Sequence, residues 1–197
     1  RQSAIKFINK KGQYDKEKKS VVITKQYPIK NEGLPLLANL TDLESLILAT
    51  NRIEDVEGNS PALAPLASLT NLTVLNLFGN KIKDVTPLAS LKALTVLYLS
   101  NNLIEDVEGN PPALAPLASL TNLTVLSLSE NKIKDVTPLA PLTSLTDLSL
   151  DDNQIQKVSP LATLKALTVL SLSGNKIKDV APLASLTNLT VLSLYEQ

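Results

Sequence analysis

Carboxylates are the side chains with the greatest chemical capability in this chain of 197 residues. The sequence contains no His, Cys or Met. A Ser-His-Asp triad, a cysteine nucleophile and a zinc site built from His or Cys are therefore excluded. Four acids, Glu130, Asp147, Asp151 and Asp152, stand out as a group that could bind a cation or transfer a proton.

The spacing of these acids supports neither chemistry. Calcium sites usually need about six or more oxygen ligands, and the sequence has no D-x-D-x-D-G loop to supply them. Nothing in the sequence indicates an enclosed cleft that would tune the acidity of Asp151 and Asp152. We therefore expect no catalytic residue, no metal site and no cofactor, and we interpret the four acids as a charged patch.

The elements that position these acids follow from an internal repeat. Residues 51–68 read NRIEDVEGNSPALAPLAS and return at 102–119 as NLIEDVEGNPPALAPLAS. The chain divides into two units of 29 residues, four of 22 and a partial one. These units are 40–68, 69–90, 91–119, 120–141, 142–163, 164–185 and 186–197. A fixed period of this length is typical of a solenoid.

Each column of the repeat has a structural interpretation. The unit at 69–90 reads LTNLTVLNLFGNKIKDVTPLAS. Its L-x-L segment alternates with a period of two, which predicts a short strand, and stacked strands predict a parallel sheet. An Ile column and a Val column follow, the latter comprising Val56, Val85, Val107, Val136, Val158 and Val180.

An Asn follows the strand in every unit, and we expect its amide to satisfy buried backbone groups as a ladder. The ladder comprises Asn51, Asn80, Asn102, Asn131, Asn153 and Asn175. Thr or Ser before Pro, as at 86–87, predicts an N-cap followed by a 3₁₀ turn or a single helical turn. A strand on one side and a tight turn on the other predict a curved stack with the strands on its concave face.

These columns resemble the leucine-rich repeat family, and the 22-residue spacing N-x-I-x-x-V-x-x-L is similar to the bacterial subtype found in internalins. The resemblance covers residues 34–197. It implies an α/β fold: a right-handed solenoid with parallel strands on the concave face and 3₁₀ or short helical turns on the convex face. It also implies a non-enzymatic module that binds a protein partner on the concave face.

Both ends of the chain depart from the family pattern. Internalins carry a helical N-terminal cap, whereas residues 1–33 favour a β-hairpin with strands at 4–9 and 20–25 around a lysine-rich segment near Gly12. This segment is either a cap or part of another domain. At the other end Gln197 takes the place of a ladder Asn, and open leucines such as Leu192 predict a further module or self-association there.

The two long units depart from the pattern as well. Each adds seven residues, which we place after the Val column, within 57–65 and 108–116. Leu63 and Leu66 at i and i+3 predict one extra turn of convex helix. One interpretation is that the additional Leu packs against the convex turns and the insertion has no role in binding. The other is that the two insertions, about 10 Å apart, form a ridge that contacts a partner.

Side chains flanking the buried leucines of each strand should form the concave face. Most are small, but two groups differ from this background. The first, the apolar cluster, comprises Ile47, Val74, Phe78, Val96 and Tyr98. The second, the acidic patch, comprises Glu130, Asp147, Asp151 and Asp152. We interpret the two groups as binding sites for an apolar and a basic portion of one partner. The alternative is that some outward residues are large by sequence drift and bind nothing.

Three functions remain open from the sequence. The first is a non-enzymatic protein-recognition module. The second is the sensor arm of a larger signalling enzyme, such as a bacterial GTPase, whose phosphate-binding loop would lie elsewhere because no G-x-x-x-x-G-K occurs here. The third is a scaffold or spacer without a partner on this face.

Composition narrows the kinds of partner. Residues 1–33 hold nine Lys or Arg against three Asp or Glu, yet no nucleic-acid motif accompanies them, so we expect no nucleic-acid partner. No apolar run approaches about 18 residues, so we expect no membrane span. The location stays open between the bacterial cytoplasm and the cell surface or exterior, because the chain has no Cys to indicate a redox compartment.

Overall fold

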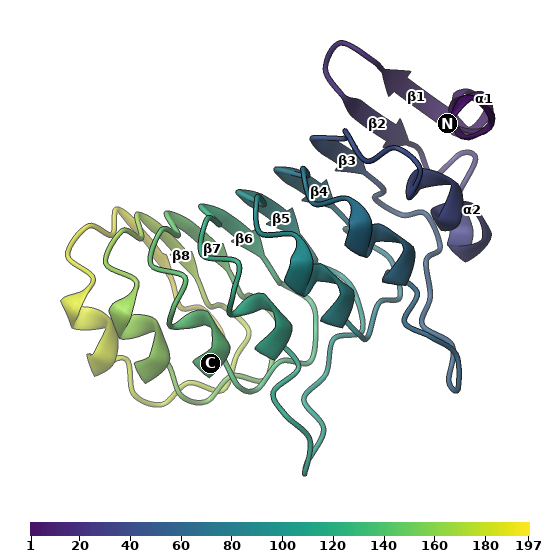
Figure 1. Cartoon of the computed structure of the whole chain (residues 1–197). Coiled ribbons are helices and arrows are strands. Elements are labelled where there is room, and N and C mark those ends of the chain that lie inside the picture. Colours follow the sequence, from purple (N-terminus) through teal and green to yellow (C-terminus); the bar gives the residue numbers. More distant parts are fainter.

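The structure, a computed structural model, describes all 197 residues and forms one curved stack of coils (Figure 1). Nine strands make one sheet in chain order, and all neighbours from β2 onward are parallel. The strands are β1 (Gly12–Asp15), β2 (Ser20–Ile23), β3 (Ser45–Ile47), β4 (Val74–Asn76), β5 (Val96–Tyr98), β6 (Val125–Ser127), β7 (Asp147–Ser149), β8 (Val169–Ser171) and β9 (Val191–Ser193). This arrangement confirms the expected leucine-rich repeat solenoid.

Short 3₁₀ turns line the side of the stack opposite the strands, as predicted (Figure 1). They are η1 (Ala64–Ser68), η2 (Thr86–Ser90), η3 (Ala115–Leu117), η4 (Thr137–Leu139), η5 (Ser159–Thr163) and η6 (Ala181–Ser185). The predicted Thr cap is wrong: Thr86 is already the first residue of η2, and its side chain makes no cap hydrogen bond. Instead the Thr86 N–H donates to Asp84 Oδ1 at 2.8 Å. The carboxylate two residues before the turn thus caps its first N–H.

The predicted strand at 4–9 is also wrong, because α1 (Gln2–Lys11) occupies this segment. Ala4 and Ile8 lie four positions apart on one helix face, and both are buried. The hairpin exists, but it starts later and pairs β1 with β2. A Cβ on Gly12 would lie 2.0 Å from the carbonyl oxygen of Val22, so glycine permits the close approach of these two strands.

The N-terminal segment continues the repeat array. β2 pairs with β3 so that Val21 lies opposite Leu46. The second helix, α2 (Lys30–Leu37), buries Leu34 and Leu37 and packs against η1. Because Ala4, Ile8 and Val21 belong to the same core as the repeat leucines, we propose that residues 1–33 cap the solenoid rather than belong to another domain.

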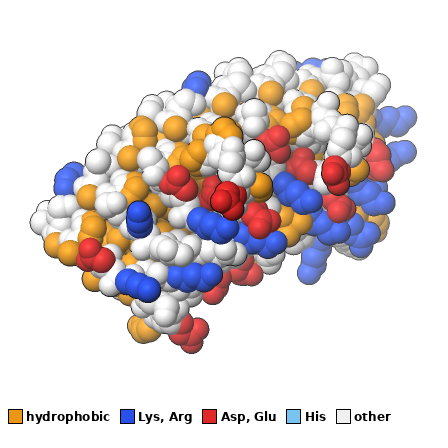
Figure 2. Space-filling view, turned by 90° about the horizontal axis from the view of Figure 1, so that it is seen from below, with side chains coloured by type: hydrophobic (Ala, Val, Ile, Leu, Met, Phe, Trp, Pro, Cys, Tyr) orange, Lys and Arg blue, Asp and Glu red, His pale blue; other side chains and the backbone are white.

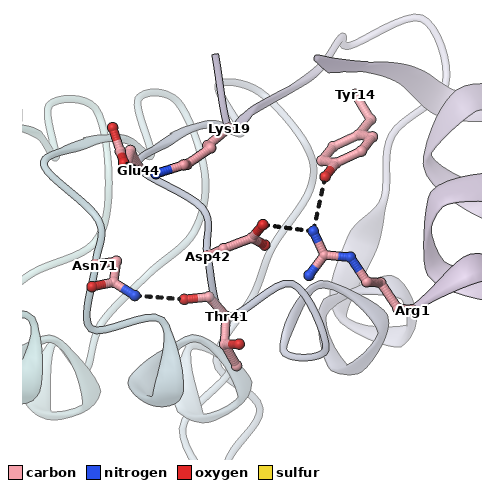
Figure 3. A network of polar contacts seen from close by, with 7 residues as sticks. All are labelled: Arg1, Tyr14, Lys19, Thr41, Asp42, Glu44 and Asn71. Carbon is pink, nitrogen blue, oxygen red and sulfur yellow. Dashed lines mark hydrogen bonds and ion pairs between the residues drawn. The ribbon is translucent and has the colours of Figure 1, made fainter. Parts of the chain in front are cut away.

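Two ion pairs fasten this segment to the first repeat (Figure 3). Arg1 Nη2 lies 2.6 Å from Asp42 Oδ2 and donates to the Tyr14 hydroxyl at 3.1 Å. Lys19 Nζ lies 2.6 Å from Glu44 Oε1. The hydrogen bond from Arg1 lowers the pKa of the Asp42 carboxyl below its ordinary value of 3.8, and the bond to Glu44 raises the pKa of the Lys19 ammonium.

The six Asn side chains form the predicted buried ladder. Asn131 is representative: its Oδ1 accepts from the Ile104 N–H of the preceding coil at 3.0 Å. Its Nδ2 donates to the Leu99 carbonyl of that coil at 3.1 Å and to the Leu128 carbonyl of its own coil at 3.0 Å. Each amide therefore joins two coils at the place where the sheet hydrogen bonds end.

Gln197 continues this ladder in the last coil. Its Oε1 accepts from the Ile177 N–H at 3.3 Å, and its Nε2 donates to the Leu172 carbonyl at 3.0 Å. The longer side chain thus serves the same groups as an Asn. The last coil is nevertheless open, because Leu192 is 43% exposed and Val191 49% exposed.

The insertions form protruding loops instead of the extra convex turn that we predict from the sequence (Figure 1). They also lie before the Val column rather than after it. Leu63 stands directly before η1, as Val85 stands before η2, and Leu63 is fully buried. Val56 and Val107, assigned to the Val column from the sequence, are instead 52% and 56% exposed.

A carboxylate closes the base of each loop. Asp55 Oδ1 accepts from the Ala62 N–H at 2.7 Å, and its Oδ2 accepts from the N–H groups of Lys83 and Asp84 in the next coil. Asp106 makes the equivalent three bonds in the second loop. The duplication therefore includes the contacts that hold each loop, not only its sequence.

We predict that Asn131→Ala lowers the free energy of unfolding by roughly 1 to 3 kcal/mol, because three buried backbone groups lose their partner. Chemical denaturation of both variants measures this. The control is Asn122→Ala, which removes a single exposed bond to the Lys92 carbonyl and should change the free energy far less. Equal effects of the two substitutions would contradict the ladder interpretation.

We also predict a pH dependence for the contact between Arg1 and Asp42. The depressed pKa of Asp42 means that its ionised form stabilises the folded state above about pH 4 and that this stabilisation is lost as the pH falls through the depressed value. Asp42→Asn should therefore be less stable than the wild type at neutral pH, by an amount that shrinks in acid. The effect should be small, since both side chains are more than 40% exposed.

The measurement is chemical denaturation of both proteins at several pH values. Glu108→Gln serves as control, because the Glu108 carboxylate has no hydrogen-bond or ion-pair partner in the chain. A difference between wild type and Asp42→Asn that stays constant from neutral pH to acid would refute the assignment.

Candidate functional site

The concave face consists of the outward side chains of β2 to β9. In the repeat strands β3 to β8 the central Leu is buried and the residue on either side is at least partly exposed, as predicted. Strand register places these outward residues in straight rows across the sheet. One row runs from Val22 through Ile47, Asn76, Tyr98 and Ser127.

The apolar cluster lies on the N-terminal half of this face. Val74 lies directly opposite Val96 on the neighbouring strand, and both are partly buried. Phe78 is 40% exposed and Tyr98 36% exposed, so both rings are available to a partner. Ile47 lies two strands from Tyr98, about 10 Å away.

Sequence analysis places Asn76 on the concave face but outside the apolar cluster, and it misses Val22. Asn76 lies between Ile47 and Tyr98 in the row, and its Oδ1 accepts from the Phe78 N–H at 3.0 Å, so it supports the backbone that carries the ring. Val22 extends the row into the N-terminal segment and is 37% exposed. Side chains alternate along β2, so that Val21 and Ile23 are buried and Val22 points outward. This position can be predicted once β2 is recognised as part of the sheet.

The acidic patch is divided between two places. Asp147 begins β7, whereas Asp151 and Asp152 follow its end, four residues or about 13 Å of extended chain away. Glu130 lies beside the latter pair, since its N–H donates to the Asp151 carbonyl at 2.9 Å. The structure thus brings Glu130, Asp151 and Asp152 together and leaves Asp147 apart.

Asp151 is engaged by its own neighbours. Its carboxylate accepts from the Ser171 hydroxyl at 2.6 Å and from the Ser173 N–H at 2.7 Å. The Asp151 N–H in turn donates to Ser129 Oγ at 3.2 Å. Through its carboxylate and its N–H, Asp151 links three coils. The more exposed Glu130 and Asp152 are the charges that a partner would meet.

Glu130 and Asp152 owe their exposure to a backbone corner. Both have positive φ, 54° and 52°, at the residue before the ladder Asn. Glycine occupies this corner in two other coils, at Gly79 and Gly174. A Cβ on Gly174 would lie 2.3 Å from Asp152 Oδ1, so glycine in the next coil makes room for the Asp152 carboxylate.

This geometry offers recognition chemistry. No three acidic side chains converge closely enough to hold a metal ion. No helix has the length and apolar character that a bilayer crossing requires. What the face presents is a group of apolar side chains on a rigid sheet, followed by two exposed carboxylates.

Comparison with known proteins identifies the family. A sequence model described as leucine-rich repeats in two copies matches residues 70–112, 114–164 and 165–197. The chain belongs to the leucine-rich repeat family. Among solved structures, an internalin from Listeria monocytogenes is 36% identical with a TM-score of 0.70, over 83% of this chain and 51% of its own. Internalin C2 from the same species is 35% identical with a TM-score of 0.72, over 89% and 80%.

Further comparisons set the range of this similarity. A leucine-rich repeat protein from Leptospira interrogans is 26% identical with a TM-score of 0.66, over 79% of this chain and 38% of its own. The search of curated proteins finds no match. This leucine-rich repeat chain is thus internalin-like and bacterial in type, as the 22-residue spacing predicts, and it spans about half the length of the first internalin.

Proposed function

We propose that this protein is a non-enzymatic module that recognises a protein partner on its concave face. Leucine-rich repeat domains generally mediate protein–protein recognition, and internalin-like proteins are typically recognition modules rather than enzymes. The observation that carries the proposal is the row of Val22, Ile47 and Tyr98 with Phe78 beside it, because exposed aromatic side chains on a rigid scaffold are the usual anchors of an interface.

The proposed partner has an apolar segment and a basic segment. The apolar segment would contact Phe78 and Tyr98, and the basic segment would approach Glu130 and Asp152 one to three coils further along. Opposite charges would steer the partner and set its direction on the face. The rigid sheet needs little ordering on binding, which favours affinity.

A second candidate is that this module is the recognition arm of a longer signalling enzyme. The fact that the chain covers 51% of one internalin and 80% of another allows for additional parts. The exposed Leu192 and Val191 support a further module or a second copy at the C-terminal coil. Both candidates assign the same role to the concave face.

We predict that Phe78→Ala combined with Tyr98→Ala abolishes capture of the partner from a lysate of the source organism. Both side chains are partly exposed and outside the core, so the variant should unfold at nearly the wild-type temperature. The matched control is Ser149→Ala with Ser193→Ala, two and four strands from Tyr98 on the same face. Identical captured proteins for all three baits would reject the concave face as the binding site.

We predict that Glu130→Gln with Asp152→Asn slows association with that captured partner. The rate should fall several-fold at low salt and converge with the wild-type rate at high salt, because exposed charges act mainly through steering. Surface plasmon resonance at several salt concentrations measures this. A salt-independent loss of affinity would argue against a steering role.

A further inference from the structure

A groove lies on the edge of the solenoid, away from the concave face, between the second insertion loop and the coil before it. The loops at 54–62 and 105–113 belong to coils separated by one 22-residue coil (Figure 1). That coil runs between them at Lys83 and Asp84, which line hollows against both loops. The larger hollow, about 680 Å³, lies against the second loop. The edge around it carries interleaved acidic and basic side chains (Figure 2).

The second loop has become apolar where it faces this groove. Residues 51–68 and 102–119 differ at two positions only, where Leu103 replaces Arg52 and Pro111 replaces Ser60. Leu103 and Pro111 both line the groove, together with Val107. Leu103 is 37% exposed, whereas the same column is otherwise polar, with Arg52, Lys81, Lys132, Gln154 and Lys176.

The groove also contains backbone groups without a partner. In the first loop the Glu54 N–H donates to Asn31 Oδ1 at 3.0 Å, and the Glu54 carbonyl accepts from Asn31 Nδ2 at 2.7 Å. The equivalent residue, Glu105, lines the groove, and neither its N–H nor its carbonyl has a bond within the chain. Glu105 pairs with Lys132 as Glu54 pairs with Lys81, so its free groups point toward the preceding coil in the same way.

We propose that this groove binds an extended segment of a partner protein. A main-chain carbonyl and N–H of that segment would bond the free N–H and carbonyl of Glu105, as the Asn31 amide bonds Glu54. An aliphatic side chain of the same segment would contact Leu103, Val107 and Pro111. A helix cannot make this contact, because its own backbone groups are already bonded, whereas an extended chain leaves them available.

The protein contains its own negative control for this groove. The same position two coils later forms a hollow of about 470 Å³, lined by Gln154, Gln156 and Lys157. Gln154 stands there in the column of Leu103, and no insertion loop supplies a proline wall. Gln156 corresponds to Glu105, and its N–H and carbonyl likewise have no bond within the chain. The open backbone is therefore common to both hollows, and the apolar wall is particular to the first.

The test is a phage-display selection of short random linear peptides that bind the intact chain. Excess soluble variant Leu103→Gln/Pro111→Ser is present as competitor, so that peptides binding elsewhere on the surface are removed. Both replacements copy residues that the fold already accepts at positions 154 and 60, and thermal unfolding checks that the variant is folded. Selected peptides should bind the wild type roughly tenfold or more tightly than the variant. They should also shift the NMR resonance of the Glu105 amide and leave that of Tyr98 in place.

The variant Phe78→Ala/Tyr98→Ala separates this proposal from the concave face. It should bind the selected peptides as the wild type does, whatever the outcome of partner capture. Three results would overturn the groove: no peptide enriched over the competitor, equal binding to wild type and Leu103→Gln/Pro111→Ser, or resonance shifts on the concave face instead of at Glu105.

Discussion

The structure depends on satisfying backbone hydrogen bonds at the corner where each short strand ends. A three-residue strand pairs few groups with its neighbours, and the turn that follows leaves buried N–H and carbonyl groups that must find partners. The Asn amide supplies both a donor and acceptor at one point, so one side chain in each coil serves its own backbone and that of the coil before it. Gln197 meets the same requirement with one more methylene.

Other side chains solve the same problem elsewhere on the coil. At the start of the strands a threonine column does so, with the Thr95 hydroxyl donating to the Thr73 carbonyl and Thr124 to Thr95, each at 3.1 Å. At the loop bases Asp55 and Asp106 serve the next coil. The Asn and Thr columns thus tie all the coils at two points, and Asp55 and Asp106 add a third point in the two long units. This explains how four repeat units of 22 residues and two of 29 stack in one register.

This rigidity shapes the functional surfaces. Because the core columns are committed to packing and hydrogen bonding, variation is confined to outward positions, and these are where Phe78, Tyr98, Glu130 and Asp152 lie. Asp151 shows the limit of reading charge from such positions, since serines of the next coil hold its carboxylate. Glu105 is the opposite case, because its backbone N–H and carbonyl have no partner within the chain and lie beside the apolar side chains of the groove.

The sequence by itself determined the strands of the repeats, the Asn ladder and a short turn on the convex side, because each rests on a local pattern repeated six times. Tertiary structure decided the features that a local pattern leaves ambiguous. The apolar residues of 4–9 fit a helix or a strand, and only the core that receives Ala4 and Ile8 selects the helix. Val56 and Leu63 both suit the Val column, and the buried site accepts Leu63 because Asp55 closes the loop before it. Contacts between coils, such as those of Asp151 and Asn31, join residues 20 or more positions apart, so no reading of one repeat alone could reveal them.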